Sequence, residues 1–148
     1  MPRLNFFTIG FTKKSAERFF ALLREAGVCR VADVRLHNVS QLAGFAQTGR
    51  FVILLREIAG IDYIHLPDLA PTQDMLDAYK KHKGDWTAYE TQFVPLMEAR
   101  HIEQTVAPEL RDGDCLLCSE HEPDQCHCRL VIEYLQRAGW DIIAHHLR

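Results

Sequence analysis

The chain has 148 residues, of which 47% are hydrophobic and 25% charged, and its formal net charge at pH 7 is −3. This composition is typical of one globular domain that is long enough to bury a core. It is not that of a basic nucleic-acid-binding domain, so a nucleic-acid partner would need a local basic patch. No apolar run approaches the length that spans a bilayer, and the N-terminal segment lacks the layout of a secretory signal. We therefore expect a single domain over residues 1–148 that works in the cytoplasm without a membrane partner.

The expected secondary structure alternates short β-rich runs with segments of helical periodicity. In chain order the sequence predicts a strand over 4–9, a helix over 16–26, a strand over 29–35, a polar loop over 36–48, a helix marked by 51–58, a strand over 61–66, a helix over 73–83, a helix over 86–104, a strand over 115–120, a helix over 126–138 and a strand over 141–147. Ser15 is a good N-cap for the first helix and Gly27 ends it. Pro95 predicts a kink or break in the helix that contains it.

Strands that alternate with helices predict an α/β fold, with a mostly parallel sheet of about five strands and helices on both faces. In such three-layer domains, ligands bind outside the carboxyl ends of the strands. The segments expected at that edge are Gly10–Thr12, Asp33–His37, Pro67–Asp68, Cys118–Glu120 and His145–His146.

The cysteines are the most unusual feature of the composition. There are five, at 29, 115, 118, 126 and 128, and four of them fall within fourteen residues. An odd number in a reducing compartment does not favour a disulfide framework. Cys29 and Cys115 are expected to pack in the core as small hydrophobic residues, and Cys128 is expected on a side face of its helix.

Cys126 and His127 stand at the start of the helix that follows the fourth predicted strand. They continue its apolar stripe, so both are expected to point toward the sheet, near Cys118 and Glu120. A helix N-terminus favours a bound anion and lowers the pKa of a thiol. The imidazole could serve the thiol as a base or as a cationic partner. Alternatively, His127 is a hydrogen-bonded core residue, and Glu120 is a general base or caps a neighbouring helix.

Asp33 and Arg35 share one face at the carboxyl end of the second predicted strand. They form either a structural ion pair or part of a site for a polar or phosphorylated ligand. Thr12, after the first predicted strand, is a third candidate for ligand binding. The turn that contains it lacks the glycine pattern of a dinucleotide-binding loop, so no nicotinamide cofactor is indicated.

The spacing of the cysteines makes zinc the cofactor to consider. Cys115 and Cys118 are an odd number of residues apart on one strand, so they point to opposite faces and cannot both bind one ion. A zinc site made by Cys118, Glu120, Cys126 and His127 fits the predicted geometry better.

Four short motifs together resemble those of the domain of unknown function 488 family. They are Thr8-Ile9-Gly10, Asp33-Val34-Arg35, Cys118-Ser119-Glu120 and Cys126-His127. The resemblance covers nearly the whole chain; it implies an α/β fold and names no reaction. The family pattern usually continues with arginine after the histidine, whereas this chain has Cys128. Arg129 lies about 100° further round the helix, in an expected exposed ladder, and cannot take that place.

Our first functional hypothesis is a small enzyme or anion-binding domain for a phosphorylated or nucleotide-like molecule. Arg35 and the helix N-terminus would hold the negative charge, Cys118 or Cys126 would be the reactive thiol, and His127 or Glu120 would move protons. The alternatives are a structural metal-binding interaction module and a redox-sensing thiol pair, Cys118 with Cys126. The sequence does not decide among them, nor whether the protein is an enzyme.

Overall fold

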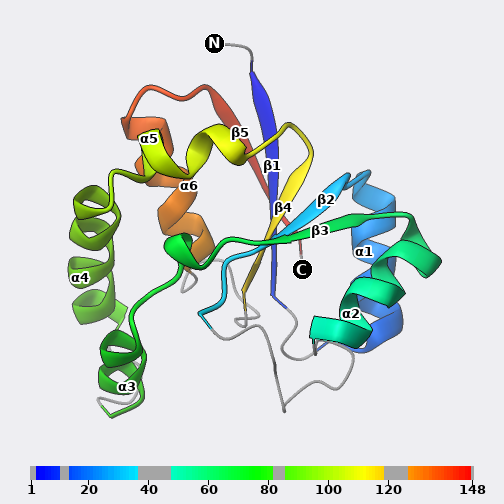
Figure 1. Ribbon diagram of the computed structural model, residues 1–148, viewed down its shortest axis with the longest axis horizontal. Coiled ribbons are helices and arrows are strands. Elements are labelled where there is room, and N and C mark those ends of the chain that lie inside the picture. The colour runs from blue at the N-terminus through cyan, green and yellow to red at the C-terminus, as the bar shows by residue number, and fades with distance from the viewer. Residues whose placement is uncertain (1–2, 11–13, 37–47, 82–85, 119–126, 148) are drawn as a thin grey trace.

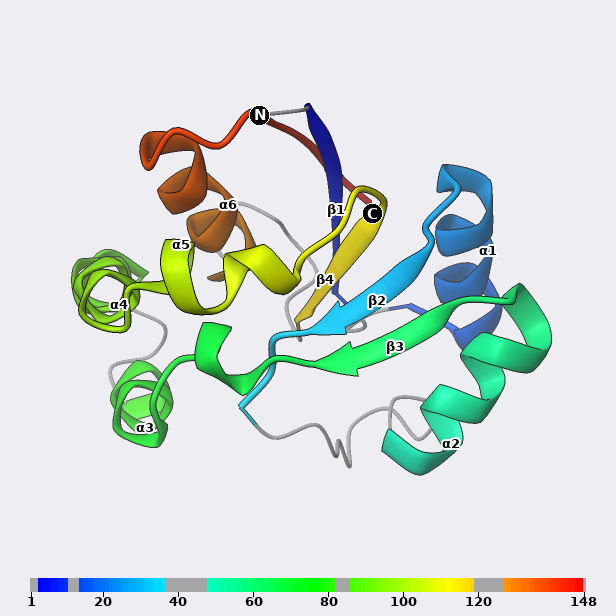
Figure 2. The same ribbon diagram turned by 45° about the horizontal axis from the view of Figure 1, so that its top comes forward.

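Five parallel strands form one sheet in the order β3-β2-β4-β1-β5. The computed structural model describes residues 3–10, 14–36, 48–81, 86–118 and 127–147. The strands are β1 (Leu4–Gly10), β2 (Arg30–Asp33), β3 (Asp62–His65), β4 (Asp114–Cys118) and β5 (Ile142–His146). The prediction of an α/β fold with a parallel sheet of about five strands is confirmed, and β3 and β5 form its edges (Figure 2).

Helices cover both faces of this sheet, as predicted (Figure 1). They are α1 (Ala16–Ala26), α2 (Thr48–Leu54) with its π-helical continuation η2 (Leu55–Ala59), α3 (Gln73–Lys81), α4 (Trp86–Ala99), α5 (Ile102–Thr105) and α6 (His127–Arg137). Two short 3-10 turns, η3 (Pro67–Leu69) and η4 (Ala107–Glu109), complete the order. Helices α1 and α2 lie on one side of the sheet and α3 to α6 on the other. Among the described helices, none combines the length and apolar character needed to cross a membrane.

The ends of α1 follow the capping signals of the sequence. The Ser15 side chain accepts a hydrogen bond from the backbone N–H of Arg18 at 3.1 Å, which satisfies a donor that the helix itself leaves open. Gly27 ends the helix with φ of 76°, a left-handed conformation that glycine adopts without steric cost. Local chemistry therefore sets both ends of this helix.

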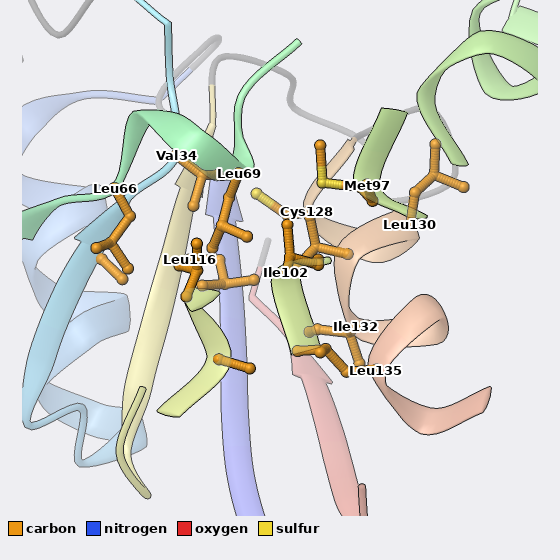
Figure 3. Packing of buried hydrophobic residues seen from close by; sticks show 14 of the residues in the cluster. Val34, Leu66, Leu69, Met97, Ile102, Leu116, Cys128, Leu130, Ile132 and Leu135 are labelled. Carbon is orange, nitrogen blue, oxygen red and sulfur yellow. The ribbon is translucent and has the colours of Figure 1, made fainter. Parts of the chain in front are cut away.

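The sheet separates two hydrophobic clusters. One lies under α1 and α2 and includes Phe19, Phe51 and Leu117. The other and larger one lies under α4 and α6 and includes Leu116 and Leu130 (Figure 3). Leu116 and Leu117 are neighbours on β4 and enter opposite clusters, because successive side chains of a strand point to opposite faces. This alternation decides which side of the sheet each residue near the carboxyl edge serves.

The sequence predicts a kink or a break near Pro95, and a break at that position is wrong. Helix α4 continues through Pro95 to Ala99, and the chain turns at His101, whose φ is 51°. Phe93 and Met97 flank the proline and are fully buried, so packing against the core keeps the helix continuous around the missing N–H.

Two of the cysteine predictions are also wrong. Cys29, expected in the core, is exposed, because it lies in the turn before β2 rather than inside a strand. Cys128, expected on a side face, is fully buried among Leu69, Ile102 and other core residues (Figure 3). The apolar face of α6 is wider than the stripe read from the sequence, since it also includes Ile132. Cys115 is buried as predicted.

Candidate functional site

A buried ion pair lies at the carboxyl end of β2. The Asp33 Oδ1 atom accepts hydrogen bonds from Arg35 Nε at 2.8 Å and from the Arg35 backbone N at 3.1 Å. The Oδ2 atom accepts from Arg35 Nη2 at 2.7 Å and from the Tyr63 hydroxyl at 2.6 Å. Asp33 is fully buried, and the Arg35 side chain is 4% exposed. The ion pair considered in the sequence analysis is therefore present, and the carboxylate is occupied in holding the guanidinium and Tyr63.

Two histidines hold the backbone that carries this pair. His65, at the end of β3, lies 2.8 Å from the Arg35 carbonyl through Nε2, and His127, the first residue of α6, lies 2.9 Å from the Val34 carbonyl through Nε2. A carbonyl oxygen only accepts, so each ring must donate from Nε2. In the neutral His127 ring the proton then resides on Nε2 and leaves Nδ1 as the basic nitrogen.

Burial sets the charge of His127. It lowers the pKa of the imidazole from 6.5 to about 4, and the hydrogen bond to Val34 and the negative charge of Asp33 oppose this shift only in part. The ring is therefore neutral at pH 7. His127 is thus the buried, hydrogen-bonded residue that the sequence analysis gave as one alternative. Of the two chemical roles considered for it, a proton acceptor suits this charge state and a cationic partner for a thiolate does not.

Asp33 and His127 approach the edge from opposite faces of the sheet. Asp33 bonds Tyr63, which packs against the cluster under α1 and α2. His127 packs against Phe93 of α4, with ring centroids 5.6 Å apart, on the other side. The two meet through the backbone at Val34, so a shared chain segment joins them.

The remaining predicted site residues cannot be placed in the same way. Thr12, Glu120 and Cys126 lie outside the residues that the structure describes. Cys118 is the last residue of β4, where its backbone pairs with Gly10 of β1, and its side chain is not described. Their catalytic and ligand-binding roles stay predictions. Within the described ranges no group of three or more His, Cys, Asp or Glu side chains could hold a metal ion. The zinc set proposed from the sequence falls mostly outside these ranges and stays a prediction too.

Sequence reasoning missed two side chains at this edge. Tyr63 and His65 were read only as part of a strand, although they hold Asp33 and the Arg35 carbonyl. His146, which was expected at this edge, lies 2.7 Å from the Thr8 hydroxyl through Nδ1, and this contact joins β5 to β1. Period-two alternation puts Tyr63 and His65 on one face of their strand, but only the strand order places that strand beside β2.

The residue after His127 is Cys128, where the pattern of the family described above usually has arginine, and this changes the charge available at the edge. Cys128 is fully buried, and desolvation raises the pKa of its thiol well above the usual value, so it is a neutral packing residue. Arg129 turns away, as predicted, with Nη1 3.5 Å from Glu133 and its guanidinium 6.0 Å from the centre of the Trp86 ring. It is only partly exposed rather than fully so. Neither residue supplies a cation to the edge.

Comparison with known proteins identifies the family. Residues 15–135 match the family described as "Domain of unknown function DUF488", and the chain belongs to that family. No curated protein and no solved structure matches the chain. The family description names no substrate or reaction, so function has to be argued from the site.

Proposed function

We propose that the carboxyl edge of the sheet binds a small anionic molecule, phosphorylated or nucleotide-like, and that His127 exchanges a proton with it. The observation that carries the proposal is the arrangement at the end of β2. There a rigidly held guanidinium, that of Arg35, shares one backbone segment with a neutral imidazole at the N-terminus of α6. Arginine and a helix N-terminus are groups that recognise anions, and the neutral imidazole supplies a proton acceptor.

Arg35 suits directional recognition rather than simple charge attraction. Asp33 neutralises its charge, and the two short contacts fix the plane of the guanidinium. A planar group held in one orientation loses little conformational entropy on binding and can match two oxygens of a phosphate or carboxylate. Asp33 acts in this proposal as a positioning residue, because its oxygens already accept four hydrogen bonds.

His127 couples binding to proton uptake. Its pKa of about 4 makes it a weak base in the free protein. An anion close to Nδ1 favours the charged form of the ring and would raise this pKa toward the range useful for general acid–base catalysis. Cys118 and Cys126 are the proposed thiol nucleophiles and Glu120 a second proton carrier, on the sequence argument alone.

Native mass spectrometry of the untagged protein, purified under reducing conditions, tests the proposal. We expect an excess mass that matches a small organic anion, or binding of one from a panel of nucleotides and sugar phosphates. Arg35→Lys should weaken this binding, because an ammonium cannot reproduce the bidentate geometry. Arg24→Lys, on the exposed surface of α1, is the matched control.

Two results would count against anion binding. One is a clean mass together with no binding across the panel. The other is an excess of one zinc that is lost with chelator and with His127→Ala, which would support the metal-binding module instead.

A further inference from the structure

A basic hollow lies beside edge strand β3, separate from the Arg35 guanidinium. It has a volume of about 370 Å³, within the range of small-ligand pockets. Its lining includes three arginines from separate parts of the chain, one carboxylate, and apolar or aromatic side chains: Arg30, Arg56, Arg111, Asp62, Val52, Ile61, Tyr63 and Ile64. No residue of this hollow was singled out by the sequence.

Asp114 organises the basic corner of the hollow. Its carboxylate accepts from Arg30 Nε at 3.0 Å and from Arg30 Nη2 at 2.7 Å, and also from the backbone N of Arg111 at 2.8 Å. Asp114 is 1% exposed and the Arg30 side chain 12% exposed, so the pair is firmly held. The contact uses Nε and Nη2 of the guanidinium, and Nη2 also donates to the Glu109 carbonyl at 2.8 Å. No described residue accepts a hydrogen bond from the third nitrogen, Nη1.

The charges around the hollow leave an excess of positive charge. Arg30 is balanced by Asp114, and Arg56 by Asp62 at 3.1 Å in an exposed pair. The side chain of Arg111 forms no ion pair with any residue that the structure describes. An anion in the hollow would meet the uncompensated guanidinium of Arg111 and the Nη1 atom of Arg30.

We propose that this hollow binds a small organic phosphate. The phosphate would lie between the Nη1 atom of Arg30 and the side chain of Arg111, since guanidinium groups pair well with phosphate oxygens. The organic part would lie against Val52, Tyr63 and Ile64. If it contains a ring, that ring would pack against the apolar side chains and the aromatic ring of Tyr63. The volume favours a compact molecule over a folded partner.

Adenosine monophosphate is a suitable probe because it joins a phosphomonoester to a flat ring. In an NMR titration of the ¹⁵N-labelled protein, we expect the amide signals of Tyr63, Ile64 and Arg111 to shift. Adenosine and inorganic phosphate should each bind more weakly than the nucleotide. Arg111→Ala should weaken the nucleotide at least about tenfold, the loss of one charged hydrogen bond. Arg24→Ala on α1 should leave it unchanged.

The fold should survive Arg111→Ala, because this residue is exposed and its described bond to Asp114 uses the backbone N–H. Equal affinity in this variant and the native protein would overturn the proposal, as would shifts confined to other parts of the molecule. Inorganic phosphate that binds as tightly as the nucleotide would also overturn it, because the organic part would then contribute nothing. Arg35→Lys separates the two proposals: it should weaken binding at the carboxyl edge and leave the hollow unaffected.

Discussion

Strand β2 carries a buried arginine–aspartate pair at each end, and the two pairs are built differently. At the carboxyl end Asp33 and Arg35 are two residues apart, and their side chains are 0% and 4% exposed. At the amino end Arg30 pairs with Asp114, which is 84 residues away in the sequence, and these side chains are 12% and 1% exposed. The first pair is local and almost completely enclosed; the second joins distant strands and borders solvent.

The difference in sequence separation and in exposure indicates a different role for each pair. The local pair fixes the geometry of one chain segment, and Tyr63 and two histidines complete its enclosure. The distant pair couples β2 to β4 and places its arginine beside the hollow. The pair of residues close in sequence is therefore enclosed within its own segment, whereas the pair of distant residues lies at the border of the hollow.

The largest expected effect is the loss of the carboxylate in the enclosed pair. Asp33→Ala leaves a buried guanidinium and the Tyr63 hydroxyl without their acceptor, and should lower the free energy of unfolding by about 3–5 kcal/mol. Asp114→Ala should cost less, because Arg30 lies nearer to solvent and can turn toward water. Urea denaturation of both variants gives the comparison, with Asp62→Ala on the surface as control. A larger loss for Asp114→Ala would reverse our ranking of the two ends.

The second largest expected effect is a dependence of stability on pH, caused by His127 at the carboxyl end of β2. The unfolded chain takes up a proton at the usual His127 pKa of 6.5, whereas the folded protein does so only near 4. The unfolded state therefore binds more protons between these values, and the free energy of unfolding falls as the pH drops from 6.5 to 4. The contribution of this residue is about 3 kcal/mol. His127→Gln, which keeps an N–H donor for Val34, should show a smaller fall over the same range. Parallel stability curves for both proteins would refute the assignment.

Tyr63→Phe should have an intermediate effect. It removes one hydrogen bond of 2.6 Å to a buried carboxylate that keeps its other donors, and should cost about 1–2 kcal/mol. Thermal and urea denaturation measure it. Tyr134→Phe is the matched control: its hydroxyl donates to Glu103 at 2.8 Å nearer the surface, and its loss should change stability less. Equal losses of stability in the two variants would mean that burial does not strengthen the hydrogen bond between Tyr63 and Asp33.

The smallest effect belongs to the exposed pair at the rim of the hollow. The Arg56 and Asp62 side chains are 76% and 66% exposed, so solvent screens their attraction. Arg56→Ala should change the free energy of unfolding by less than about 0.5 kcal/mol. A loss comparable with that of Asp114→Ala would show that this pair is part of the structural support rather than a surface contact.

Much of the fold could be predicted, because it depends on local signals. Ser15 and Gly27 mark the ends of α1, and the period-two alternation of Leu116 and Leu117 assigns them to opposite faces. The errors arose where packing overrides those signals. Pro95 lies within a helix because the core on both sides of it keeps the helix continuous, and Cys128 is buried because the covered face of α6 is wider than its apolar stripe.

The candidate site could be predicted only in part. Asp33 and Arg35 were paired correctly because residues two apart on a strand share a face. Tyr63 and His65 could not be found, because the order of the strands decides which segment lies beside β2. The thiol and carboxylate candidates Cys118, Glu120 and Cys126 remain predictions.

By itself, the sequence determined the α/β class, the parallel sheet, the capped first helix and the shared strand face of Asp33 and Arg35. These follow from hydrophobic periodicity, capping and residue spacing, which act over a few residues. Only the tertiary structure decided that His127 is buried against the Val34 carbonyl, that Arg30 meets Asp114, and that three arginines surround one hollow. Those contacts join residues far apart in the chain, and burial, which sets their charge states, is a property of the packed molecule as a whole.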